Sequence, residues 1–312
     1  MTISGDYPSA KPQALTSPGQ AKLYGTVLLL LAAAAWGLGN VSQKTILDHL
    51  DPFAANGITC LVGALVLYPF ARREGAPAST GSFWLMAKVA LLFTLAATLM
   101  QLAYAHTTVT NAGFLANTAA VLTPLIGWLI YAQRPPALIW PASLCALAGL
   151  YLMGGGGLSA LVYGDLLALA AALFYAFWNL LLAQYVVRHG RPSSMTVMQL
   201  LICGGVCMGV SAVWYGVPTP SAIWAAAPEI VVLGVLSKAG AYVLMALGLR
   251  YISAAKAAVL VSAESVVGAA CAMVILSESP GPIRLIGGFL IIGGVILASC
   301  APAKIKPDQR AV

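Results

Sequence analysis

Long apolar runs separated by short polar turns dominate the pattern of this sequence. Most runs are about 20 residues long, the length that an α-helix needs to cross ~30 Å of hydrocarbon. The alternating segments of about 10 residues that are typical of membrane β-barrels are absent from the sequence. The pattern therefore predicts an all-α membrane protein with ten transmembrane helices, at about residues 24–46, 52–71, 83–105, 109–131, 137–155, 163–187, 193–215, 228–250, 254–277 and 282–300.

Composition agrees with this pattern. The 312 residues are 60% hydrophobic and only 8% charged, whereas soluble domains have about 25% charged residues. Residues 1–23 are mostly polar, rich in Pro and Ser at their start, and lack the apolar core of a signal peptide, so we expect a disordered cytoplasmic tail. Residues 301–312 form a second predicted cytoplasmic tail.

Lysine and arginine are distributed unevenly between the two sides of the predicted bundle. With the N-terminus inside, twelve of the 16 fall on the side of the termini, and only Lys44 and Arg284 lie near helix ends on the other side. The positive-inside rule then predicts that both termini are cytoplasmic. The net charge of +7 comes from this asymmetry and not from a basic patch on a soluble domain, which argues against a nucleic-acid partner.

The two halves of the chain repeat each other. An offset of 145 aligns residues 83–152 with the second half without gaps and places Asn111 on Lys256. Each half, at 24–155 and 163–300, carries five predicted helices, and because five is odd the second half enters the membrane from the opposite side. Such inverted repeats are typical of transporters, whose binding site lies near the midplane between the halves.

One local pattern occurs in both halves. Trp36 is followed one helical turn later by Asn40, and Tyr175 is followed one turn later by Asn179. Trp36 and Tyr175 both lie too deep in their helices to act as aromatic anchors at the membrane surface. We therefore expect these two aromatics and Trp178 either to pack in the core or to line a cavity and stack on a planar ligand.

Two ionisable residues lie deep within predicted helices. Lys238 and Glu264 fall about 18 Å and about 15 Å from the inner edge of the membrane, and each needs a partner there. Their similar depths predict an ion pair. That pair either fixes the packing of two helices, lines the cavity and meets a substrate's carboxylate and amino group, or exchanges a proton.

Further polar residues complete the predicted site. Tyr104, Tyr242 and Asn111 are candidates, and Asn111 is preferred to Asn117 because the two asparagines lie on different faces of an unbroken helix. The six cysteines lie in or at the ends of apolar segments without other metal ligands near them, so we expect no metal site and no cofactor. The predicted substrate-binding residues are Trp36, Asn40, Tyr104, Asn111, Tyr175, Trp178, Asn179, Lys238, Tyr242 and Glu264.

Several short motifs resemble those of a known family. Trp36-Gly37 with a lysine at 44, the Asp51-Pro52 turn, and Asn111-Ala-Gly-Phe-Leu followed by Thr123-Pro124 are similar to the EamA type of the drug/metabolite transporter superfamily. The resemblance covers about residues 24 to 300 and is strongest to the exporters of aromatic amino acids. It implies a transporter of the bacterial inner membrane that exports amino acids or similar metabolites by alternating access.

Other functions remain open from the sequence. A carrier of sugar-phosphates or nucleotide-sugars needs several cations in its cavity, whereas the sequence places only Lys238 deep within a predicted helix and pairs it with Glu264. A transporter of amphipathic drugs is a further alternative. An intramembrane enzyme is disfavoured because the sequence has no H-E-x-x-H motif and no Ser–His pair at spanning depth. The expected partners are a small-molecule substrate and the lipid bilayer, with monomer and homodimer both open.

Overall fold

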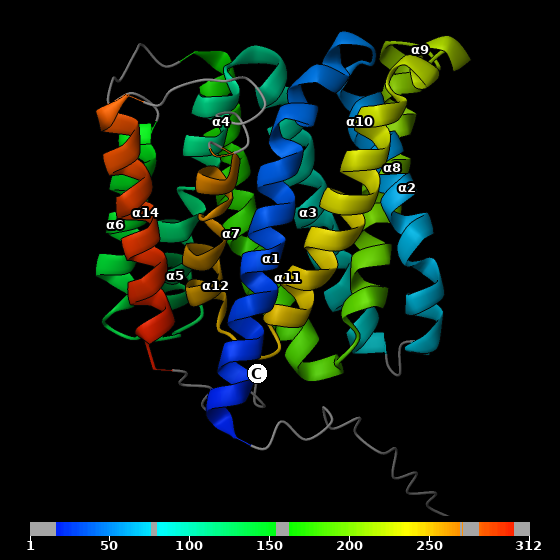
Figure 1. The fold of residues 1–312 in the computed structure, drawn as a ribbon. Coiled ribbons are helices and arrows are strands. Elements are labelled where there is room, and N and C mark those ends of the chain that lie inside the picture. Colours follow the sequence, from blue (N-terminus) through cyan, green and yellow to red (C-terminus); the bar gives the residue numbers. More distant parts are fainter. Residues whose placement is uncertain (1–16, 76–79, 154–161, 269, 271–280, 303–312) are drawn as a thin grey trace, which may run out of the picture.

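The computed structural model describes residues 17–75, 80–153, 162–268, 270 and 281–302 (Figure 1). Within these ranges all regular elements are helical and no strand occurs. Their bounds are α1 Pro18–Thr45, η1 Ile46–Asp48, α2 Pro52–Arg73, α3 Thr80–His106, α4 Val109–Ala116, α5 Ala119–Leu129, α6 Ile139–Met153, α7 Tyr163–His189, α8 Pro192–Trp214, α9 Pro220–Ala225, α10 Ala227–Val231, η2 Val232–Ala241, α11 Tyr242–Gly248, α12 Ala254–Val261 and α14 Pro282–Cys300.

The predicted all-α membrane fold is confirmed. In the described part of the chain, 8 helical segments are long and apolar enough to cross a membrane, and Ile139–Met153 is a shorter apolar helix. Large apolar side chains such as Leu65 and Phe289 are more than 70% exposed on the outside of the bundle, where lipid can cover them. The predicted helix at 254–277 lies partly outside the described residues, so ten crossings stay a prediction.

The first helix begins earlier than expected. Pro18 is its first residue, and the Ser17 hydroxyl accepts a hydrogen bond from the Gln20 backbone N–H at 3.3 Å, which caps the helix. Residues 18–23, which we placed in the tail, are therefore helical. The prediction was wrong there because it followed hydrophobicity alone, whereas a Ser-Pro pair is a capping signal. The rest of the predicted tail lies outside the described residues.

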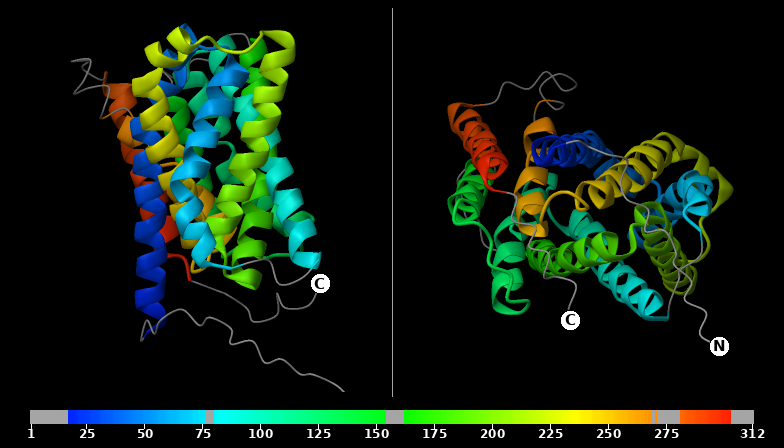
Figure 2. Two further views of the ribbon diagram at one scale, coloured as in Figure 1. Left: turned by 90° about the vertical axis from the view of Figure 1, so that its right-hand side faces the viewer. Right: turned by 90° about the horizontal axis from the view of Figure 1, so that it is seen from below.

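Helices at corresponding places in the two halves pack against each other. The second helices of the two halves, α2 and α8, pack together, and so do the last helices, α6 and α14. The third helix of the first half, α3, packs on α7, and reciprocally α1 packs on η2 and α11. Seen from below in Figure 2, α6 and α14 lie together at one edge of the bundle, and α2 and α8 lie toward the opposite edge.

Two helices that were predicted to be continuous are broken. The segment at 109–131 is interrupted at 117–118, between α4 and α5, and the segment beginning at 254 is interrupted at 262–263, after α12. Both bounds of α12 are those of α4 shifted by 145, the offset of the sequence repeat. The two breaks therefore occupy equivalent places in the two halves, as in transporters whose interrupted helices form the binding site.

Glycines allow the closest helix contact. A Cβ atom on Gly149 of α6 would lie 2.5 Å from the backbone oxygen of Gly287 in α14, and a Cβ on Gly287 would lie 2.5 Å from the oxygen of Gly149. No other residue fits either position without moving a backbone. The reciprocal contact shows why small residues occur on the facing sides of these two helices.

Candidate functional site

A cavity lies between the two helix breaks. Its volume is about 110 Å³, which is room for several waters or for part of a small organic molecule. It is lined by Trp36, Asn40, Gln43, Met100, Tyr104, Ala116, Asn117, Ala119, Ala120, Tyr175, Trp178, Asn179, Tyr242, Met245, Ala258, Val261 and Glu264. Eight of the ten predicted substrate-binding residues are in this set, and binding by them stays a prediction.

Aromatic rings form one wall of the cavity. The Tyr242 ring lies edge-on to Trp36, with centroids 5.0 Å apart, and edge-on to Trp178 at 5.7 Å. Tyr175 lies 6.0 Å from Trp178, and its hydroxyl is 3.4 Å from the Tyr242 hydroxyl. The rings come from α1, α7 and α11, so both halves of the chain contribute to this wall. Edge-to-face contacts are a preferred arrangement of aromatic pairs, and they hold the rings in fixed positions.

Residues behind the wall position these rings. Phe93 packs edge-on to Tyr242 with centroids 4.8 Å apart, and the Trp178 indole N–H donates to the Gln199 side-chain oxygen at 2.8 Å. Lys44 donates to the backbone carbonyls of Tyr104 and Thr107, which ties the end of α1 to the end of α3. Our sequence reasoning did not identify Phe93 or Gln199, since neither differs in pattern from an ordinary residue of an apolar helix.

A carboxylate lies at the second helix break. The Asn117 side-chain N–H donates to the Glu264 carboxylate at 3.0 Å and to the Gly113 carbonyl at 2.9 Å. Glu264 is the first residue of the helical turns that resume at 264–268. The two breaks thus contribute one side chain each to a single hydrogen bond, Asn117 from the first and Glu264 from the second.

Asn179 brings an unpartnered acceptor to the cavity. Its side chain is only 5% exposed, and its Oδ1 atom has no hydrogen-bond partner within the described part of the chain. A buried amide oxygen without a donor is unfavourable unless a ligand or water supplies one. Its counterpart in the repeated pattern, Asn40, lines the same cavity from α1.

The preference for Asn111 over Asn117 is wrong. Asn117 lines the cavity, whereas Asn111 does not and lies in the first turn of α4, where its backbone N–H donates to the Thr108 hydroxyl at 3.1 Å. The choice assumed one continuous helix. The break after Ala116 carries Asn117 into the gap between the halves, which helical periodicity cannot predict.

The predicted Lys238–Glu264 ion pair does not form. The Lys238 ammonium donates to the Asn56 side-chain oxygen of α2 at 2.9 Å, and Lys238 does not line the cavity. Its side chain is 3% exposed, and its Nζ lies 5.9 Å from the centroid of the Tyr242 ring. Lys238 belongs to the π-helix η2, whose five-residue hydrogen-bond spacing rotates side chains away from where an α-helix would place them.

Three thiols surround the partner of Lys238. The Asn56 side-chain N–H donates to the sulfurs of Cys203 and Cys207 at 3.4 and 3.5 Å, and the Cys60 thiol is 3.7 Å from Asn56 Oδ1. These cysteines are free and buried. Within the described residues no group of three or more His, Cys, Asp and Glu side chains is arranged to hold a metal ion. The cluster therefore serves as polar surroundings for a buried ammonium.

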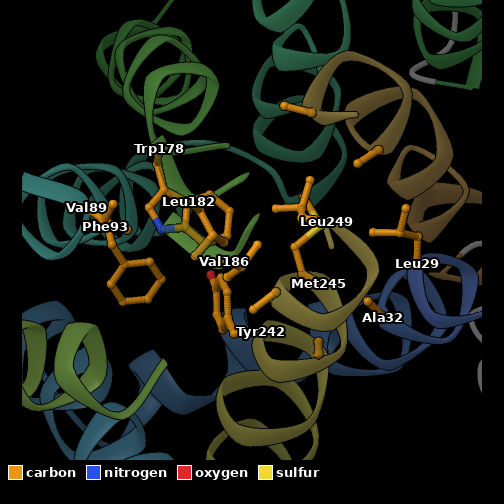
Figure 3. Close-up of a cluster of buried hydrophobic side chains, with 14 of the residues drawn as sticks. Leu29, Ala32, Val89, Phe93, Trp178, Leu182, Val186, Tyr242, Met245 and Leu249 are labelled. Atoms are coloured by element: carbon orange, nitrogen blue, oxygen red, sulfur yellow. The ribbon is translucent and has the colours of Figure 1, made fainter. Parts of the chain in front are cut away.

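An apolar layer lies on one side of the cavity. The starts of α1 and α8 and the end of α14 lie at the same end of the bundle (Figure 1). Leu29 of α1 is nearer that end than Trp36, and Leu182 and Val186 of the oppositely directed α7 are nearer it than Tyr175. Figure 3 shows Leu29, Leu182 and Val186 in the core cluster that also contains Trp178 and Tyr242. Fully buried side chains of the core cluster therefore lie between the aromatic wall and the end of the bundle where α1 begins.

The fold and site define a polytopic α-helical membrane protein with an interior cavity between two similar halves. The profile of the EamA-like transporter family matches the chain twice, at residues 23–155 and 162–300. The chain belongs to this family of membrane transporters.

Similar proteins agree with this membership. An uncharacterized transporter of Archaeoglobus fulgidus is 28% identical over 288 residues, which cover 90% of this chain and 87% of that protein. The uncharacterized transporter YwfM of Bacillus subtilis is 24% identical over 299 residues, covering 92% and 97%. A protein of known crystal structure shares the fold with a TM-score of 0.70 and 20% sequence identity. The match covers 90% of this chain and 97% of that chain.

Proposed function

We propose that this chain exports small metabolites, chiefly aromatic and other amino acids, across a bacterial inner membrane with both termini in the cytoplasm. The observation that carries the proposal is a cavity with an aromatic wall at two equivalent helix breaks. Interrupted helices expose backbone and polar groups at membrane depth only where protein or a ligand satisfies them.

An aromatic amino acid fits the chemistry of the cavity. Its ring can stack against the wall formed by Trp36, Tyr175 and Tyr242. Its ammonium group can donate to Glu264 and to the unpartnered Oδ1 of Asn179. Its carboxylate can accept from the amide and hydroxyl groups of the lining.

The pairing of the helices supports alternating access. We infer that the two halves are inverted five-helix repeats, because α4 and α12 have equivalent bounds and α1 and α3 exchange partners reciprocally. If the halves exchange conformations, the apolar layer beside Leu182 opens and an equivalent layer closes on the other side. Export then needs no chemistry beyond binding and release.

The alternatives fit the cavity differently. Sugar-phosphates and nucleotide-sugars need cations that meet phosphate, and Lys238 is held by Asn56 outside the cavity. Amphipathic aromatic drugs would use the same rings as an amino acid, so they stay a second candidate that transport assays must separate from the first.

Transport by the purified chain tests the proposal. Proteoliposomes loaded with radiolabelled tryptophan, phenylalanine, leucine or lysine should release the aromatic amino acids faster than protein-free liposomes loaded in the same way. Trp36→Ala should lower this rate about tenfold or more by removing a ring of the wall. Trp224→Ala, at a residue that is 82% exposed on α9, is the matched control and should leave the rate unchanged. Failure to move any amino acid would overturn the proposal.

A further inference from the structure

The cavity lining has one strongly ionisable side chain, and it is acidic. Within the part of the chain that the structure describes, Glu264 is the only lining residue with a carboxyl, ammonium, guanidinium or imidazole group. The Lys238 ammonium donates to Asn56 and lies 5.9 Å from the centroid of the Tyr242 ring, and Lys238 itself is not a lining residue. A ligand in the cavity therefore finds a carboxyl group and no ammonium or guanidinium group in the lining.

The lining also offers free hydrogen-bond acceptors. Asn117 donates one hydrogen bond to Glu264, whereas an ionised carboxylate can accept about four. Asn179 Oδ1 accepts none from the described residues and is deeply buried. A ligand that donates several hydrogen bonds would satisfy both acceptors, and a protonated amine donates up to three.

The aromatic wall favours the same sign of charge. Trp36, Tyr104, Tyr175 and Tyr242 line the cavity together with Glu264. Ring faces attract cations, and the attraction increases when water is excluded. An anion against a ring face would be repelled by that face and by an ionised Glu264 carboxylate.

We infer that this cavity recognises the positive charge of its substrate and that the substrate's own carboxylate is dispensable, so aromatic amines that lack a carboxylate are substrates. The inference rests on the proposed function, because it assumes that this cavity is the transport site. It extends that function from amino acids to protonated amines as a class.

Four indole compounds separate the contributions of the two charges. Tryptophan carries both charges, tryptamine only the positive one, indole-3-propionate only the negative one, and tryptophol neither. Their dissociation constants can be measured by isothermal titration calorimetry with the full chain in detergent at pH 7, which avoids passive leakage of tryptamine through a bilayer. Tryptamine should bind at least as tightly as tryptophan, and indole-3-propionate should bind about 10- to 100-fold more weakly than tryptamine.

A conservative substitution tests the role of Glu264. Glu264→Gln keeps an oxygen that can accept from Asn117 and removes the charge. It should weaken tryptamine about tenfold or more and leave tryptophol unchanged. Asp48→Asn makes the same chemical change at an exposed carboxylate outside the cavity lining and should alter none of the four constants.

The outcomes distinguish the inference from the proposed function. Tight tryptophan binding with tryptamine at least tenfold weaker, or indole-3-propionate bound as well as tryptamine, would overturn the inference and leave amino-acid transport standing. If none of the four compounds binds and proteoliposomes move no amino acid, the proposed function itself fails. The comparison uses the unmodified chain, so it decides the inference even if Glu264→Gln does not fold.

Discussion

Two deep charges in this bundle are each held by an asparagine side chain, and their surroundings differ. Lys238 donates to the amide oxygen of Asn56 at 2.9 Å, and Glu264 accepts from the amide nitrogen of Asn117 at 3.0 Å. Each asparagine thus presents the end of its amide that the charge requires. The Lys238 side chain is 3% exposed among apolar residues and thiols, whereas Glu264 is partly exposed to the cavity.

This difference separates a structural charge from one that can meet a ligand. Lys238 is enclosed on all sides by protein, so the stability of the bundle depends on its partner. Glu264 has room beside it, so a ligand or water can complete its hydrogen bonds. The sequence predicts similar membrane depths for both residues, so depth does not distinguish them. What distinguishes them is whether the neighbouring helix continues or breaks.

The largest effect is expected where the partner of the enclosed charge is removed. Asn56→Leu leaves the Lys238 ammonium without its oxygen acceptor in a water-excluded place, which should destabilise the protein by about 3–5 kcal/mol. The loss is measurable as a large drop in the melting temperature of the detergent-solubilised protein.

A double substitution sharpens this first prediction. Asn56→Leu combined with Lys238→Met removes both partners and should recover most of the lost stability. Asn111→Leu, on an asparagine outside the cavity lining, is the control and should change stability by no more than about 0.5 kcal/mol. If the double variant is no more stable than Asn56→Leu, the lysine is not the reason that Asn56 is needed.

A medium effect is expected where α1 touches the second helix break. A Cβ on Gly37 would lie 2.5 Å from the backbone oxygen of Glu264, so Gly37→Ala must push apart the segments that form the cavity. We expect a destabilisation of about 1–3 kcal/mol together with weaker binding of aromatic ligands. Gly39→Ala on the same helix, whose Cβ would lie 3.4 Å from the nearest atom, should change both quantities much less. Equal effects of the two substitutions would show that the cavity does not depend on this contact.

Neutralising the charge that faces the cavity should affect stability less. Glu264→Gln loses one charge-assisted hydrogen bond, and the cavity can supply water in its place, so we expect a change of about 1 kcal/mol. Melting temperatures measured without ligand compare this variant directly with Asn56→Leu. A loss as large as that of Asn56→Leu would make Glu264 a structural residue and remove the contrast between the two charges.

The smallest effect on stability is expected for Tyr242, which lies between Lys238 and the cavity. Tyr242 lies 5.9 Å from Lys238 on one side and lines the cavity on the other. Tyr242→Phe keeps the ring packed on Trp36 and Phe93 and removes only the long hydroxyl contact with Tyr175, so stability should fall by about 0.5–1 kcal/mol. Tyr163→Phe, on an exposed ring of α7, is the matched control and should be neutral. A loss of several kcal/mol would show that the hydroxyl holds the two regions together.

Much of the site could be predicted because it repeats. Trp36 and Asn40 have counterparts in Tyr175 and Asn179, and one cavity collects all four. A buried amide or indole in a long apolar helix is rare enough to be noticed in a sequence. Phe93 and Gln199 could not be found in this way, because a phenylalanine in an apolar helix has no distinguishing pattern and the role of Gln199 depends on the Trp178 indole that it meets.

The errors have a common physical cause. Asn111 was preferred to Asn117, and Lys238 was paired with Glu264, because both inferences assumed regular α-helices. The chain is interrupted at 117–118 and at 262–263, and the π-helix η2 carries Lys238. Each irregularity rotates the residues that follow it, so helical periodicity assigns them to the wrong neighbour.

The sequence by itself determined that this chain is a helical membrane protein of repeated halves with aromatic and amide groups at depth, because hydrophobic length and repetition are local properties of the chain. Only the tertiary structure decided which deep charge faces the cavity. That choice depends on where two helices break and on Asn56 of α2 meeting Lys238 of η2, a contact between residues 182 positions apart.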